Sequence, residues 1–191
     1  DFYAAVNSAG AYRLPYVGVV VNNQWAISVP RSAQTGAETL AQKGIAGGLA
    51  CVQVDGNDAV AMLAVMREAI DRARSGGGGT VVEAVTYRLS DHTTADDARR
   101  YRPEEEVKNA WAREPLKRLR TLLENRGAWD QAREDAFRLE ANASVDVEVN
   151  AYLETRTQPV TSMFDYLYAE LPHDLREQRA WALRAEGGRH G

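Results

Sequence analysis

The chain has 191 residues, enough for one domain with a substantial hydrophobic core and several further helices. Its net charge of −4 argues against a nucleic-acid-binding surface, and no apolar run is long enough to span a membrane. The single cysteine and the lack of a recognisable signal peptide favour a cytoplasmic protein.

A helix is predicted over residues 1–13, where apolar residues recur close to a helical period, and Leu14-Pro15 ends it. Because Asp1 already lies inside this pattern, we expect the chain to be part of a longer protein. The following segment, 16–21, is short, β-branched and not alternating. That pattern is typical of a strand buried on both faces in a parallel sheet covered by helices.

Two more segments, 50–55 and 80–88, have the same apolar character and are predicted as the second and third buried strands. Between the first two strands, a helix from Thr35 to about Lys43 is predicted, with Glu38 as its capping-box partner. A longer helix is predicted over 59–74, with Asp58 as its cap. Its predicted core face includes Met62, Leu63, Met66 and Ile70.

Polar residues follow all three predicted strands. The first ends in Asn22-Asn23, the second in Asp55-Gly56, and the third in Arg88, with His92 shortly after it. Ligands of open α/β sheets bind beyond the carboxyl ends of the strands, so these residues are expected to share one rim. Such a rim suits an anion, a cation that bridges it and a titratable imidazole.

Several of these residues also have a structural interpretation. An asparagine amide oxygen is a neutral ligand for a hard cation, but Asn22-Asn23 is equally compatible with a simple turn. Asp55 is expected to brace its own loop. The glycine run 75–79 follows a helix and lacks the Gly-x-Gly-x-x-Gly spacing, so it is rejected as a phosphate-binding loop.

Residues 89–102 are polar, carry both signs of charge and show little periodicity, which is typical of a functional loop. Helices are predicted for the rest of the chain, over 104–112, 116–125, 129–156 and 163–168. The last of these is rich in aromatic residues and serves either a subunit contact or packing on its own domain.

These elements predict an α/β fold with a mostly parallel sheet flanked by helices, followed by a helical C-terminal arm. The division is expected after residue 103. Residues 1–103 form the α/β part, and residues 104–191 form the helical arm for packing and subunit contacts.

The residues resemble a known family. Asn22-Asn23-Gln24-Trp25-Ala26-Ile27-Ser28 is similar to the second half of the thiamine diphosphate motif, in which a Gly-Asp-Gly precedes an Asn-Asn. Further similar segments are Asp1 to Asn7, Val54 to Asp58, Thr86 to Arg88, and His92 to Asp97 with Tyr101-Arg102. Together they resemble the alpha subunit of the decarboxylating component of 2-oxoacid dehydrogenase complexes, of the pyruvate or branched-chain type. The expected fold is therefore the C-terminal half of the thiamine diphosphate-binding fold.

This resemblance implies a set of site residues. Magnesium ligands are implied at Asn23, through its side chain, and at Trp25, through its backbone carbonyl. Trp25 replaces the usual tyrosine, a change that a backbone ligand tolerates. His92 matches the loop histidine that reaches the cofactor and the reacting substrate, so it is the implied catalytic residue.

Other loop residues also match the family. Arg88 is implied to bind the cofactor and, with Asp96, Tyr101 and Arg102, to order the loop. Thr93 matches a serine that kinases phosphorylate in mitochondrial relatives. Phosphate at this position would repel the neighbouring carboxylates and disorder the loop.

The resemblance also implies cofactors and partners. The cofactors are thiamine diphosphate and magnesium, and the reaction is oxidative decarboxylation of a 2-oxoacid with acyl transfer to a lipoyl-bearing acyltransferase component. Family members are α2β2 heterotetramers, and their beta subunit supplies the glutamate that activates the cofactor. The Gly-Asp-Gly half of the motif does not occur before Asn22 in this chain, so the site is expected to be incomplete.

Two alternatives remain open from the residues themselves. One is a magnesium-dependent phosphoryl-transfer enzyme that uses the same strand-end rim. The other is a subunit without catalysis that only supports assembly.

Overall fold

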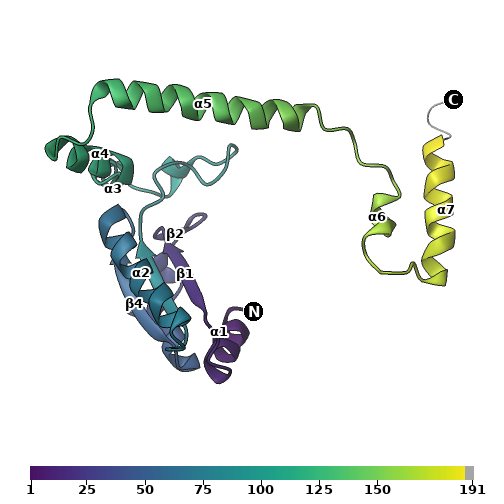
Figure 1. Cartoon of the computed structure of the whole chain (residues 1–191), viewed down its shortest axis with the longest axis horizontal. Coiled ribbons are helices and arrows are strands. Elements are labelled where there is room, and N and C mark those ends of the chain that lie inside the picture. Colours follow the sequence, from purple (N-terminus) through teal and green to yellow (C-terminus); the bar gives the residue numbers. More distant parts are fainter. Residues whose placement is uncertain (188–191) are drawn as a thin grey trace. The chain divides into compact units, whose positions relative to one another are not determined.

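The chain is described by a computed structural model over residues 1–187, and it divides into two compact units at Asp130. The first unit contains a sheet and the helices packed on it, and the second unit is helical (Figure 1). The predicted α/β class and the helical C-terminal part are confirmed. None of the helices within residues 1–187 combines the length and the apolarity needed to cross a membrane.

A three-stranded parallel sheet forms the centre of the first unit, in the order β1-β5-β4. Its strands are β1 (Val17–Asn22), β4 (Ala50–Asp55) and β5 (Thr80–Val85). The ladder of β5 stops at Val85, earlier than the predicted end at residue 88. A separate antiparallel hairpin consists of β2 (Trp25–Ala26) and β3 (Val29–Pro30).

Side chains of β5 alternate between two covered faces, because successive strand residues point to opposite sides of a sheet. One face packs against helix α1 (Phe2–Ala11), in a core cluster of Val6, Ala9, Leu49 and Val81. The other face packs against helix α2 (Ala59–Arg74), in a core cluster of Val54, Ala69 and Val82.

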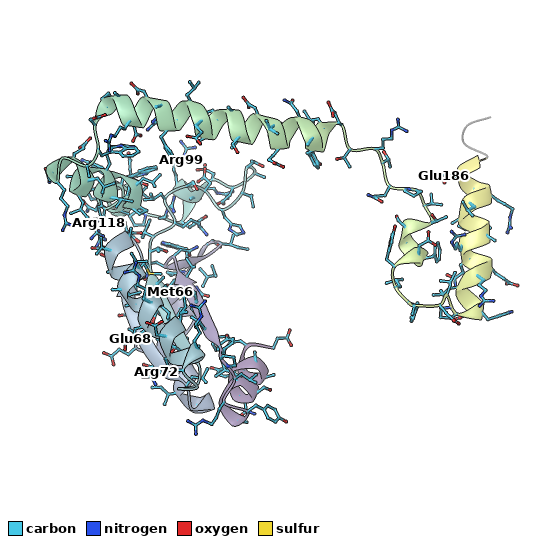
Figure 2. All side chains as sticks on the ribbon, viewed as in Figure 1. Met66, Glu68, Arg72, Arg99, Arg118 and Glu186 are labelled. Carbon is cyan, nitrogen blue, oxygen red and sulfur yellow. The ribbon has the colours of Figure 1, made fainter. Side chains whose placement is uncertain are left out.

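Helix α2 lies over the sheet (Figure 1), and Asp58 caps it as predicted, by accepting hydrogen bonds from the N–H groups of Val60 and Ala61. Met66 packs against the core, whereas Glu68 and Arg72 are exposed (Figure 2). The predicted core face is wrong at Leu63, which is 51% exposed. The buried positions of α2 are the small residues Ala69 and Ala73, which allow the helix to approach the sheet closely.

The expectation that all three strands are buried on both faces is wrong for β1 and β4. Val19 and Val21 of β1 are 44% and 64% exposed, and Gln53 and Asp55 of β4 are exposed. Only β5, the middle strand of the described sheet, is buried along almost its whole length. A strand at the edge of this sheet has only one neighbouring strand. A helix that packs over the middle strand covers the side chains of an edge strand only in part.

The helix predicted from Thr35 to Lys43 is also wrong. The Thr35 hydroxyl accepts a hydrogen bond from the Ala37 N–H, which closes a local turn instead. The helical segment is the 3₁₀ helix η2 (Ala41–Gly47), and a carboxylate from β5 accepts the N–H groups at its start. This long-range contact decides where the helix begins.

Helices α3 (Glu104–Trp111) and α4 (Pro115–Asn125) complete the first unit, with short 3₁₀ turns η1 (Arg31–Ala33) and η3 (Ala98–Arg100). Arg118 of α4 forms ion pairs with Asp55 at 2.7 Å and with Asp58 at 3.1 Å, beside the start of α2 (Figure 2). These bonds tie α4 to the sheet, and α4 belongs to the first compact unit, 1–130. Asp55 also accepts a hydrogen bond from the Asn57 N–H, which confirms its loop-bracing role.

The second unit consists of α5 (Gln131–Leu153), α6 (Ser162–Asp165) and α7 (His173–Gly187). Arg179 of α7 pairs with Asp165 at 2.8 Å and fixes α6 against α7. The aromatic segment predicted over 163–168 is helical only to Asp165. Its side chains are largely exposed, including Met163, Tyr166, Leu167 and Tyr168.

Candidate functional site

The carboxyl ends of the three parallel strands meet at one level of the sheet. Asn22 of β1 and Asp55 of β4 are both in register with Val85 of β5. Past the ladder, Thr86 N donates to Asn22 O at 2.9 Å and Arg88 N donates to Asn23 O at 3.1 Å. The predicted convergence of the strand ends on one rim is therefore confirmed.

The segment Asn22 to Trp25 forms a tight turn held by its own side chains. Asn22 Oδ1 accepts a hydrogen bond from Gln24 N at 3.2 Å, and Asn23 Oδ1 accepts one from Trp25 N at 3.1 Å. Gln24 has a φ of 72°, in the left-handed region that residues other than glycine seldom adopt. The turn interpretation of the two asparagines is thus correct, and it does not exclude the cation interpretation, because an amide oxygen has two lone pairs.

Behind this turn lies Glu83, a buried carboxylate that the sequence analysis did not single out. The side chain is 0% exposed. One carboxylate oxygen accepts a hydrogen bond from Asn22 Nδ2 at 2.6 Å, and the other accepts the N–H groups of Leu40 and Ala41 at 2.7 and 3.0 Å. The signal in the sequence is an acidic residue inside an apolar strand, since a buried charge must find donors.

These donors keep Glu83 ionised. Burial alone raises the pKa of a carboxyl group, but here hydrogen bonds from Ala41 N, the side chains of Asn22 and Gln53, and Leu40 N outweigh burial. The pKa of Glu83 is therefore held below its ordinary value. The carboxylate acts as a fixed acceptor between the strand-end turn and η2.

A chain of hydrogen bonds runs from Arg88 into the predicted functional loop. Arg88 donates to the Ile27 carbonyl at 2.7 Å and to the Tyr101 hydroxyl at 2.8 Å. The Tyr101 hydroxyl in turn donates to Asp96 at 2.5 Å, and the same carboxylate oxygen accepts the His92 N–H at 2.9 Å. The loop histidine is thereby connected through side chains to the strand end.

Aromatic and ionic contacts reinforce this connection. The rings of Trp25 and Tyr101 lie 5.6 Å apart, centroid to centroid, at a tilt of 48°. Arg102 is buried and donates to the backbone carbonyls of Arg88, Leu89 and Ser90. Hydrogen bonds from the Tyr101 hydroxyl and the His92 N–H hold the pKa of Asp96 below its ordinary value, so this anchor is charged at neutral pH.

A cavity of about 960 Å³ opens at the same rim, between the strand ends and α3. Its lining includes Trp25, Asp55, Thr86 and Tyr87 from the sheet side, and Glu106 from α3. Its volume is within the range of small-molecule and cofactor sites. Asn23, Arg88 and His92 are not part of the lining.

The structure thus brings together most of the predicted site residues. Asn23, Trp25 and Arg88 are joined by backbone bonds and by the contacts of Tyr101. His92 is attached to this group through its backbone N–H, and its side chain is exposed. Within residues 1–187 no group of three or more His, Cys, Asp or Glu residues could hold a metal ion. Neutral oxygen atoms at this rim that could ligate a hard cation are the Asn23 amide oxygen and the backbone carbonyls of the turn, whereas the Asp55 carboxylate is paired with Arg118.

Replacing Tyr101 with phenylalanine is expected to loosen the loop while keeping the ring contact with Trp25. The change removes the hydroxyl that joins Arg88 to Asp96, so the His92 N–H loses a well-positioned acceptor. We expect roughly tenfold faster hydrogen exchange of the His92 amide in this variant than in the wild type. Tyr12→Phe, at an exposed tyrosine of the first unit, is the matched control. Equal exchange rates in the two variants would contradict the network.

Comparison with known proteins identifies relatives of this chain. Residues 1–160 match the family described as "Dehydrogenase E1 component". The chain is 44% identical over 179 residues to "Pyruvate dehydrogenase E1 component subunit alpha" of Staphylococcus aureus strain COL and of Staphylococcus epidermidis. Each match covers 93% of this chain and 48% of the relative, so the chain spans about half the length of the curated relatives it matches.

Proposed function

This chain belongs to the dehydrogenase E1 component family, and from that premise we propose that it acts in the alpha subunit of a thiamine diphosphate-dependent 2-oxoacid dehydrogenase that decarboxylates pyruvate. The observation that supports this most strongly is the linkage of the Asn23 turn to the His92 loop through Arg88 and Tyr101. The strand end offers oxygen atoms that suit a cation, and the loop carries an imidazole that suits an anion. Together they suit an anionic cofactor bound with a metal ion. We propose pyruvate as the substrate, in place of a branched-chain 2-oxoacid, because the relatives that are 44% identical are named pyruvate dehydrogenase.

The residues present fit part of a magnesium site. Magnesium takes six oxygen ligands and in enzymes is held by a few protein groups together with phosphate oxygens and water. In the proposal, the Asn23 amide oxygen and the Trp25 carbonyl supply two ligands. Asn23 is half-buried, and its side chain is already oriented by the hydrogen bond from Trp25 N. The remaining ligands come from the diphosphate, from water and from the part of the protein outside this chain.

Thiamine diphosphate, when bound, supplies the carbanion chemistry that removes CO₂, and the protein supplies orientation and electrostatics. His92 is the proposed catalytic residue of this chain. Its backbone is anchored to Asp96 and its imidazole is exposed, so the ring can donate a hydrogen bond to a phosphate oxygen or to the reacting substrate. Arg88 is proposed to act on the cofactor through its charge and through the loop it orders.

The proposed partners follow from the subunit name of the relatives and the resemblance in sequence. A beta subunit completes the active site in an α2β2 heterotetramer, and a lipoyl-bearing acyltransferase accepts the acyl group. A cytoplasmic location is also proposed. The exposed residues of α6 and the segment after it, Met163, Tyr166, Leu167 and Tyr168, are proposed to take part in the subunit contact.

The test is the cofactor dependence of turnover. We expect the full-length alpha subunit with its beta subunit, dialysed free of cofactor, to bind thiamine diphosphate in isothermal titration calorimetry only when magnesium is present. Pyruvate decarboxylation with an artificial electron acceptor should require both. Cofactor-independent phosphoryl transfer from a nucleotide with magnesium alone would instead favour the phosphoryl-transfer alternative.

A further inference from the structure

The buried carboxylate of Glu83 has a consequence for the proposed metal site that extends beyond packing. Glu83 lies on the middle strand, on the face that packs against α1 and η2, and none of its surface is exposed. A desolvated carboxylate is costly unless each oxygen finds a donor. In the structure, one oxygen accepts from the side-chain amide of Asn22, and the other accepts from the backbone N–H groups of Leu40 and Ala41 at the start of η2.

An ionised carboxylate accepts hydrogen bonds and cannot donate them, so it decides the orientation of the Asn22 amide. The amide nitrogen must point toward Glu83, at 2.6 Å, and the amide oxygen must then point away. That oxygen faces Gln24 N at 3.2 Å and accepts its hydrogen bond. If the amide were reversed, its NH₂ group would face the Gln24 N–H, and two hydrogen-bond donors would oppose each other.

Gln24 is the residue of the turn whose backbone needs this support. Its φ of 72° is unfavourable for a residue with a side chain, and the bond from its N–H to Asn22 stabilises that conformation. The Gln24 side chain also donates to Asn22 O at 3.2 Å. The next bond, from Trp25 N to Asn23 Oδ1, orients the amide proposed as a metal ligand.

We infer that Glu83 is a positioning residue for the metal-binding turn, acting through the Asn22 amide on the conformation of Asn23 and Trp25. The inference rests on the proposed function, because it concerns the affinity of that site for its cation. An apolar residue at this position would leave the Leu40 and Ala41 N–H groups unpaired and would not orient the Asn22 amide, whereas the carboxylate does both.

The test uses the full-length alpha subunit in complex with its beta subunit and Mn²⁺ as a spectroscopic probe. Free Mn²⁺ is measured by electron paramagnetic resonance during titration, with and without thiamine diphosphate, so the readout does not depend on turnover. Glu83→Gln keeps the size of the side chain but allows the Asn22 amide to reverse. We expect it to weaken Mn²⁺ binding about tenfold, the lower end of the effect of groups that bond a metal ligand directly, because Glu83 acts through Asn22.

Two further variants separate positioning from stability. Val82→Ala removes a fully buried neighbour on the opposite face and should destabilise the fold while leaving Mn²⁺ affinity unchanged. Asn22→Ala should weaken Mn²⁺ binding to a similar degree, and Glu83→Gln should add little in that background, since both changes break one relay. If Glu83→Gln does not assemble, Asn22→Ala alone decides the question.

The outcomes are distinct. Wild-type affinity in Glu83→Gln, or in Asn22→Ala where that variant decides, would overturn the inference and leave the proposed function intact. A similar loss of affinity in Val82→Ala would also overturn it, since general destabilisation would then be sufficient. A wild-type complex in which thiamine diphosphate does not tighten Mn²⁺ binding would refute the proposed function, and the inference with it.

Discussion

Substitution of His92 by alanine is expected to lower kcat for pyruvate decarboxylation by about 10²–10⁴-fold, the usual effect of removing a positioned acid–base group. Within the described part of the chain, the only His92 atom with a hydrogen-bond partner is its backbone N, which donates to Asp96. The alanine variant keeps this bond, so the loop should stay ordered and only the imidazole is lost. The steady-state rate of the full-length protein with the proposed beta subunit measures the effect.

His173→Ala provides the matched control, because it removes an exposed imidazole from the second unit. We expect that variant to keep the wild-type rate. Both variants should form the same assembly in analytical ultracentrifugation. Unchanged turnover in His92→Ala would mean that this loop does not reach the reacting groups, and it would support a subunit that serves assembly only.

The second large effect is expected at Asn23. Replacing it with alanine removes the proposed amide ligand together with the acceptor of the Trp25 N–H. We expect magnesium binding to weaken at least about 100-fold, the upper end of the effect of groups that only orient a ligand. Raising the magnesium concentration should restore part of the thiamine diphosphate binding, because the remaining ligands are intact.

Asn125→Ala, at the end of α4, carries the same chemical change away from the rim and should leave the magnesium titration unchanged. Calorimetric titration of thiamine diphosphate at several magnesium concentrations measures both variants. If Asn23→Ala bound cofactor and magnesium as tightly as the wild type, the turn would be structural only.

Much of this rim could be predicted from the sequence, because its signals are local. A short β-branched run that ends in two asparagines marks the end of β1 without reference to the rest of the chain. The same holds for Asp55 at the end of β4. The parallel order then places these ends at one level, as the register of Asn22 and Asp55 with Val85 confirms.

The parts that sequence reasoning missed depend on contacts between distant residues. Glu83 acquires its role only when the fold brings the N–H groups of Leu40 and Ala41 to its carboxylate. Because of the same contact, the helical segment begins at Ala41. The local capping pattern had predicted a start at Thr35. A capping box stabilises a helix by satisfying its first N–H groups, and a distant carboxylate can do the same at another position.

Burial was predicted less well than position. Apolar composition alone does not distinguish a central strand from an edge strand, and Val19 and Val21 of β1 are more exposed than their residue type suggests. The loop network of Arg88, Tyr101 and Asp96 was expected from the resemblance to a family rather than from periodicity. Side-chain chemistry in an irregular loop leaves no periodic signal.

We propose that this chain contributes to pyruvate decarboxylation with thiamine diphosphate. The most direct measurement is the release of CO₂ from pyruvate and from 3-methyl-2-oxobutanoate by the full-length protein with the proposed beta subunit, with thiamine diphosphate and magnesium present. We predict that both acids are turned over, with kcat/KM about 10–200-fold in favour of pyruvate, the discrimination that an apolar pocket provides. No turnover of either acid by an assembled complex with bound cofactor would contradict the claim.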